Sequence, residues 1–112
     1  MAITITSIQE LQTYLQGVLD RANHHAINVS QITLALVGAI IWRADGQISV
    51  REYGGRPANM IWFHIGDHRY VLTFNHGTQK IELKDRTQTG AIITTFDNTS
   101  SHQDVIAAFE NL

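Results

Sequence analysis

The sequence predicts a single α+β domain, an antiparallel sheet of five or six strands with an N-terminal and a C-terminal helix packed on one face. A chain of 112 residues is enough for one domain, since domains usually contain about 100–200 residues. β-Branched and aromatic segments separated by turn residues fill the middle of the chain, and helical spacing of apolar residues occurs near both ends. Strands joined by tight turns pair antiparallel, so the two terminal helices are expected on the same face of the sheet.

The first helix is predicted to begin at Ser7. Ser7 and Glu10 have the spacing of a capping box, in which the two side chains satisfy backbone N–H groups at a helix start. Apolar residues then recur three and four positions apart on one side of this helix, namely Ile8, Leu11, Leu15, Val18 and Ala22. A short C-terminal helix is expected over His102–Asn111, with Ser100 and Gln103 as its capping pair.

Six strands are expected between the helices, at Thr33–Arg43, Gln47–Tyr53, Asn59–Ile65, His68–Phe74, Gln79–Lys84 and Ala91–Phe96. Asp45-Gly46 predicts a type I′ hairpin turn between the first two, because Asp and Gly tolerate the positive φ that both central positions of that turn require. Gly66-Asp67 predicts a second two-residue hairpin turn. Both turns fix a register for the strands that they join.

Opposed residues of a hairpin share a face of the sheet, so the two predicted turns assign side chains to faces. One face is apolar and suited to helix packing, with the opposed pairs Ile61–Leu72, Phe63–Tyr70 and Ile65–His68. The other, called the reverse face below, collects the candidate functional residues Trp42, Arg51, Tyr53, Met60, Trp62, His64 and Arg69. Both tryptophans are therefore expected on the side that the helices leave uncovered.

Two short helices can cover one face of such a sheet, so the reverse face needs another explanation. Trp, Tyr, Met and Arg are enriched in protein interfaces, and we predict a non-enzymatic protein that forms a twofold homodimer through this face or through an edge strand. A second interpretation is a site for a small anionic ligand, bound or hydrolysed, at Arg51, His64 and Arg69. A third is that the sheet curls over its own tryptophans, or that the segment Arg86–Gly90 folds across them.

Charge and composition exclude several classes of function. Eight Lys and Arg against ten Asp and Glu give a net charge of -2, which argues against nucleic-acid binding, although residues 43–86 carry seven bases against five acids. The absence of cysteine excludes disulfides and thiolate chemistry. The apolar run Ile32–Trp42 is too short to cross a membrane, and the N-terminus lacks the pattern of a signal peptide. A cytoplasmic protein is predicted.

No motif for catalysis, metal binding or cofactor binding is found. His64 and His68 fall on opposite faces in the predicted register, so they cannot hold one metal ion. Glu52 is expected on the face opposite Arg51, which prevents a catalytic cluster with His64. The segment Gly54–Asn59 has the glycines of an anion-binding nest, but no helix follows it, and an ordinary strand connection is the simpler interpretation.

Two stretches of the sequence resemble small proteins carried on integron mobile gene cassettes. They are Ile5–Leu11 (ITSIQEL), which opens the first helix, and Gly55–Phe63 (GRPANMIWF), which enters a hairpin. The resemblance extends over nearly the full length. It implies a bacterial cytoplasmic protein that often forms oligomers, and it assigns no functional residues, because such proteins share a source and not a mechanism.

Overall fold

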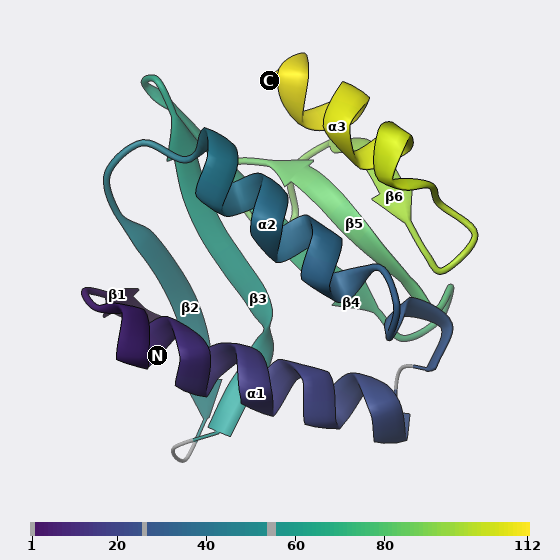
Figure 1. Ribbon diagram of the computed structural model, residues 1–112. Helices are drawn as coiled ribbons and strands as arrows, with labels where there is room; N and C mark the ends of the chain where they lie inside the picture. The colour runs from purple at the N-terminus through teal and green to yellow at the C-terminus, as the bar shows by residue number, and fades with distance from the viewer. Residues whose placement is uncertain (1, 26, 54–55) are drawn as a thin grey trace.

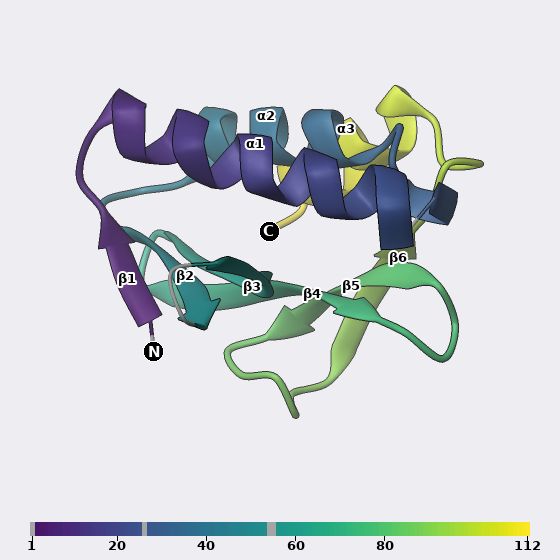
Figure 2. The ribbon, with the colours of Figure 1, turned by 90° about the horizontal axis from the view of Figure 1, so that it is seen from below.

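A six-stranded antiparallel sheet with the strand order β1-β2-β3-β4-β5-β6 forms one layer of the computed structural model. The structure describes residues 2–25, 27–53 and 56–112, and the side chains of 4–20, 28–51 and 60–112. The elements are β1 (Ala2–Ile5), α1 (Ile8–His25), the 3-10 helix η1 (Ile27–Val29), α2 (Thr33–Arg43), β2 (Ile48–Tyr53), β3 (Arg56–Ile65), β4 (His68–Asn75), β5 (Lys80–Asp85), β6 (Ile92–Phe96) and α3 (His102–Glu110). Figure 1 shows α2 running between α1 and α3, and in Figure 2 these three helices lie above the sheet.

The α+β class and the antiparallel sheet are confirmed, but the predicted strand Thr33–Arg43 is wrong. This segment is the helix α2, and its spacing of three and four buries Thr33, Leu36 and Ile40. Leu and Ala favour the helix, and Thr33 Oγ1 donates a hydrogen bond to the carbonyl of Val29. The helical layer that covers the sheet therefore contains a third α-helix, which was not predicted from the sequence.

The strand β1 pairs with β2 at the edge where the predicted strand Thr33–Arg43 was expected. β1 pairs antiparallel with β2, with Ile3 opposite Val50 and Ile5 opposite Ile48. The number of strands matches the prediction because one unpredicted strand replaces one wrongly predicted strand.

The predicted hairpin turn at Asp45-Gly46 is also wrong, since these residues connect α2 to β2. Gly46 has a φ of +72°, but Asp45 is absent from the positive-φ residues of the described chain, so the type I′ turn is not formed. The Asp45 carboxylate instead accepts a hydrogen bond from the N–H of Gly66, at 2.7 Å. Asp45 thereby ties the end of α2 to the turn between β3 and β4.

The hairpin of β3 and β4 is confirmed residue by residue. Ile61 lies opposite Leu72, Phe63 opposite Tyr70, and His64 opposite Arg69. Gly66 has a φ of +61°, as the first central position of a two-residue turn requires.

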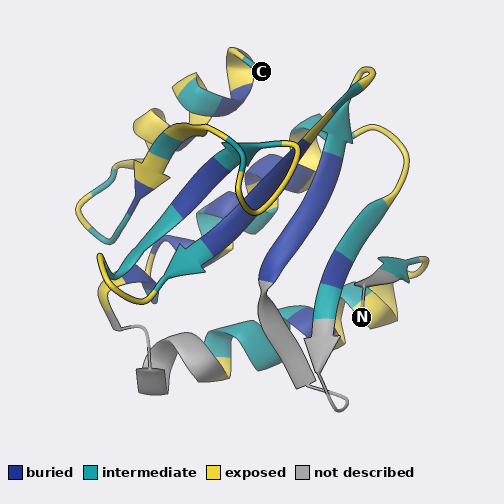
Figure 3. Cartoon of the chain, turned by 180° about the vertical axis from the view of Figure 1, so that it is seen from behind, coloured by how far each residue is buried: buried dark blue, intermediate teal, exposed yellow. Residues whose placement is uncertain are grey.

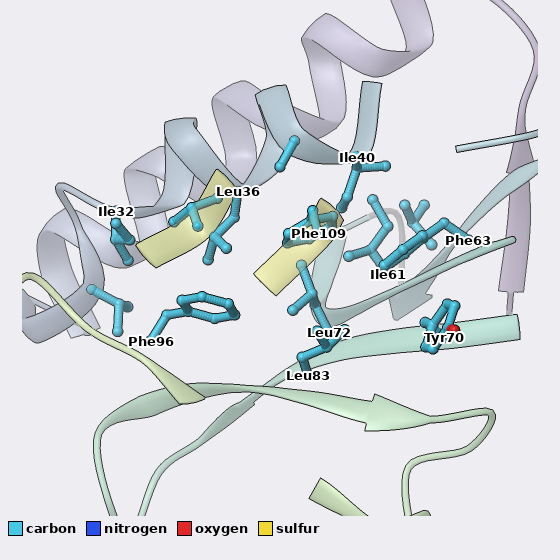
Figure 4. Packing of buried hydrophobic residues seen from close by; sticks show 14 of the residues in the cluster. Ile32, Leu36, Ile40, Ile61, Phe63, Tyr70, Leu72, Leu83, Phe96 and Phe109 are labelled. Atoms are coloured by element: carbon cyan, nitrogen blue, oxygen red, sulfur yellow. The ribbon is translucent and has the colours of Figure 1, made fainter. Parts of the chain in front are cut away.

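The main core fills the space between the helices and one face of the sheet. Phe63 of β3 and Phe109 of α3 are fully buried and stack with their ring centroids 5.8 Å apart (Figure 4). Leu83 of β5 and Leu36 of α2 belong to the same cluster and pack into it from opposite layers. Because the faces alternate along each strand, the residues between these positions project from the reverse face.

The helices α1 and α3 both begin with side-chain caps from their own first turn. Ser7 Oγ accepts from the N–H of Glu10, as predicted, while the Glu10 carboxylate accepts from Thr6. At α3 the capping box is formed by Ser101 and Asp104, one position after the predicted pair.

The loop between β6 and α3 anchors α2. Asn98 Oδ1 accepts hydrogen bonds from the N–H groups of Gln31 and Ile32, at 2.8 and 3.1 Å, and so caps the start of α2 from another part of the chain. At the other end, Arg43 Nε donates to the carbonyl of Phe109 at 3.1 Å. In the same loop, hydrogen bonds from Thr99 hold the pKa of the Asp97 carboxyl below its ordinary value.

Replacing Asn98 with Ala is expected to lower the free energy of unfolding by about 1–2 kcal/mol, because two N–H groups at the start of α2 lose their acceptor. Asn98→Asp keeps an acceptor oxygen and adds a negative charge at a helix N-terminus, so its stability should stay close to that of the wild type. Urea denaturation measures both. An Asp variant as unstable as the Ala variant would contradict the capping role.

Candidate functional site

The seven candidate residues do not share one surface. Trp42 was expected on the reverse face beside Trp62, and this is wrong because Thr33–Arg43 forms a helix. Trp42 lies on α2 with 54% of its surface exposed, and the Arg43 guanidinium lies over its ring at 5.8 Å. The side chain of Tyr53 falls outside the described residues.

Met60 and Trp62 do project from the reverse face, but they are not exposed. Together with Val71 they form a second buried cluster, and Trp62 is 7% exposed. The expectation that the Trp62 ring is available to a partner or ligand is therefore corrected. Trp62 is thus buried within its own chain, as the third interpretation expected of both tryptophans, whereas Trp42 is exposed.

The cations of the reverse face gather around the Trp62 ring. The guanidinium carbon of Arg51, on β2, lies 5.5 Å from the ring centroid, and that of Arg69, on β4, lies 5.4 Å from it. Both distances are in the range of cation–π contacts. Arg69 is exposed, whereas Arg51 and His64 are half-buried.

A buried ion pair and a folded connection lie on the same face. Glu82 is buried, and its carboxylate contacts Lys84 Nζ at 3.2 Å and Asn75 Nδ2 at 3.2 Å. Lys84 Nζ also donates to the carbonyl of Gln88 at 2.8 Å, which holds the connection between β5 and β6 to the strand before it. Figure 3 shows this connection crossing in front of the sheet, and Figure 2 places it on the side away from the helices.

The largest exposed apolar feature of α2 was missed. Leu34, Ile41 and Trp42 are 52, 58 and 54% exposed, and they share one side of the helix with the exposed Gly38. We call Leu34, Gly38, Ile41 and Trp42 the α2 stripe. These four residues have the i, i+4, i+7, i+8 spacing of a helical face, but the sequence alone did not reveal it because the segment is apolar nearly throughout.

Within the described part of the chain, His64 meets no catalytic partner. Its side chain forms no hydrogen bond with any residue that the structure describes, so nothing orients it as a general base. Another histidine, His68, does meet a carboxylate: its Nε2 contacts Asp85, and its ring lies 4.6 Å from that of Tyr70. This diagonal contact links β4 and β5 at their half-exposed ends.

An open groove lies between the edge strand β6 and α3. Its apolar lining includes Ile93, Phe96, Ala107, Ala108 and Leu112. Ile92 and Ile93 are among the exposed apolar residues of β6.

The fold and these surfaces define a small α+β protein with an uncharged helical stripe on one side and a cationic aromatic cluster on the other. In the described residues, no helix has the length and apolar character needed to span a membrane. The chain belongs to a family of integron cassette proteins: the family model VCH_CASS14, described as Integron cassette protein VCH_CASS1 chain, matches residues 11–104. The resemblance noted in the sequence is confirmed. A search of curated proteins gave no match to the chain.

Proposed function

We propose that the protein functions as a self-associating module and forms a twofold homodimer through the α2 stripe. The observation that carries this proposal is that α2 is apolar on both its inner and its outer side. A helix that is hydrophobic all round is normally buried, and an 11-residue helix is too short to be buried in a membrane. A second protein surface is the remaining cover for its outer side.

The shape and charge of the stripe favour a second copy of the same chain. No Asp, Glu, Lys or Arg occurs from Thr33 to Trp42, so a twofold axis through this helix brings no like charges together. Gly38 lies in the middle of the stripe, and a Cβ built there meets nothing within 4 Å. Two copies of α2 could therefore cross closely at Gly38, with Leu34 and Ile41 packing on either side of the crossing point.

The size of the stripe suits the centre of a dimer interface. Its three large side chains expose on the order of 300 Å², which is comparable with the largest apolar patch of a typical monomer. A stable interface buries about 800 Å² on each partner, so neighbouring surfaces have to supply a rim. On α1 the exposed residues Gln9, Gln12, Thr13 and Gln16 are polar and uncharged, as is common at an interface rim.

The test is the solution mass, measured by light scattering after size-exclusion chromatography. The wild type is expected at twice the chain mass of 12.6 kDa. Gly38→Glu and Trp42→Glu should both give the monomer mass, because each places a charge in the apolar centre. Gly38→Glu is the sharper variant, since Glu has a higher helix propensity than Gly and should not weaken the isolated fold.

Thr89→Glu is the matched control, because it adds the same charge at an exposed position of the connection between β5 and β6, which Figure 2 shows on the side of the sheet away from α2, and it should leave the mass doubled. A wild-type protein that stays monomeric at high concentration would refute the dimer. A dimer that persists in both stripe variants and dissociates in Ile92→Glu would place the contact at the β6 edge instead.

A further inference from the structure

The reverse face holds two guanidinium groups over one aromatic ring. Arg51 and Arg69 come from the strands on either side of β3, and each guanidinium carbon lies within 5.5 Å of the Trp62 ring centroid. A guanidinium over a ring uses its flat face for that contact, so the contact does not use the N–H donors in its plane. In Arg69, whose guanidinium forms no hydrogen bond or ion pair with a described residue, those donors have the fork geometry that matches the oxygens of a carboxylate or phosphate.

One charge on this face, that of Arg69, is not balanced by any residue that the structure describes. Among the described side chains that the reverse face carries on β2–β5, the acidic one is Glu82, and it is paired with Lys84 at 3.2 Å. Arg69 is exposed and forms no ion pair with any described residue. Arg69 lies near a second cation, Arg51, over the same ring, and the two charges give this place a positive local potential although the whole chain has a net charge of -2.

Trp62 acts here as a platform. It is 7% exposed, too deeply buried to stack on a ligand itself. Its contact with both guanidiniums restricts two long side chains before any ligand arrives, which lowers the entropy lost on binding. The geometry points to a site for a small oxyanion ligand, one that carries a phosphate or carboxylate group and is bound between Arg51 and Arg69 above Trp62. This site is independent of the α2 stripe, which lies on the other side of the sheet.

Trp62 fluorescence can report on this site directly. The chain has two tryptophans, so the variant Trp42→Phe leaves Trp62 as the sole reporter. Inorganic phosphate and malonate are titrated separately, with sodium chloride used to keep the ionic strength constant. A saturable change in Trp62 fluorescence is expected with phosphate, with malonate or with both. The anion that produces the change shows whether the site prefers a phosphate or a carboxylate group. In the Trp42→Phe background, Arg69→Gln should weaken the response about tenfold or more.

Arg86→Gln in the same background is the matched control. It removes another exposed arginine, whose Nε lies 4.0 Å from Asp85, and should leave the titration unchanged. If Arg69→Gln does not fold, Arg69→Lys keeps the charge but loses the fork, and a weaker response is again expected. The proposal is overturned by a response no larger than that to sodium chloride, by equal binding with and without the Arg69 fork, or by a response to single-stranded oligonucleotide alone.

Discussion

Replacing Lys84 with Met is expected to lower the free energy of unfolding by about 3 kcal/mol or more, because it leaves the buried carboxylate of Glu82 without its cation. Lys84 Nζ lies 3.2 Å from that carboxylate, and the side chains of Lys84 and Glu82 are 15 and 7% exposed. Asn75 continues to donate one hydrogen bond to Glu82, but a neutral amide cannot balance a buried charge. Urea denaturation at neutral pH measures the loss.

The double variant Glu82→Gln/Lys84→Met distinguishes a lost ion pair from lost packing. It removes both charges and keeps similar side-chain volumes, so it should recover most of the stability that Lys84→Met loses. A Lys84→Met variant within about 1 kcal/mol of the wild type would show that the pair behaves like a solvated surface pair.

The β3–β4 hairpin could be predicted because its information is local. Gly66 allows a two-residue turn, and alternation along the strands then places Phe63 and Tyr70 on the core face. The same register correctly put Trp62 and Arg69 on the reverse face. Once one turn is known, period-two alternation fixes every other pair in the hairpin.

The segment Thr33–Arg43 could not be assigned by the same reasoning. Its inner and outer sides are both apolar, so neither a period of two nor a period of 3.6 stands out, and a buried strand and a buried helix look alike. What decides the outcome is nonlocal, because β1 occupies the edge of β2 and Asn98 caps the start of the helix. The apolar outer side of this helix made the prediction ambiguous, and the same outer side is the exposed α2 stripe.

The side chains that β3 and β4 contribute to the reverse face were predictable, but their burial was not. Register alone gives the neighbours of Trp62, whereas its exposure depends on the arginines above it and on the fold of the sheet around it. The contact between His68 and Asp85 could not be predicted from the register either. It is diagonal, and the direction of the His68 side chain decides whether it contacts the residue directly opposite or a diagonal neighbour.

Replacing Gly90 with Ala is expected to destabilise the fold by about 3 kcal/mol, because the connection between β5 and β6 has no room for a Cβ. A Cβ at this position would lie 1.8 Å from the carbonyl oxygen of Asp85 and 3.1 Å from that of Thr87. Both contacts are with backbone atoms, so no rotation of a side chain relieves them. The connection therefore has to open in the Ala variant. Opening strains the backbone hydrogen bonds that hold it closed, from the N–H of Gly90 to the carbonyl of Thr87 and from the N–H of Asp85 to the carbonyl of Ala91.

The opening should be visible on the reverse face as well as in the stability. The Lys84 bond to Gln88 holds this connection down, and its loss should expose more of the buried cluster around Trp62. In the Trp42→Phe background, Gly90→Ala is therefore expected to shift Trp62 emission to longer wavelength. Gly77→Ala is the control, since its Cβ meets the side-chain oxygen of Asn75 at 3.2 Å, which can move. Equal losses of stability in the two variants, with no change in Trp62 emission, would mean that the 86–91 connection does not shield the reverse face.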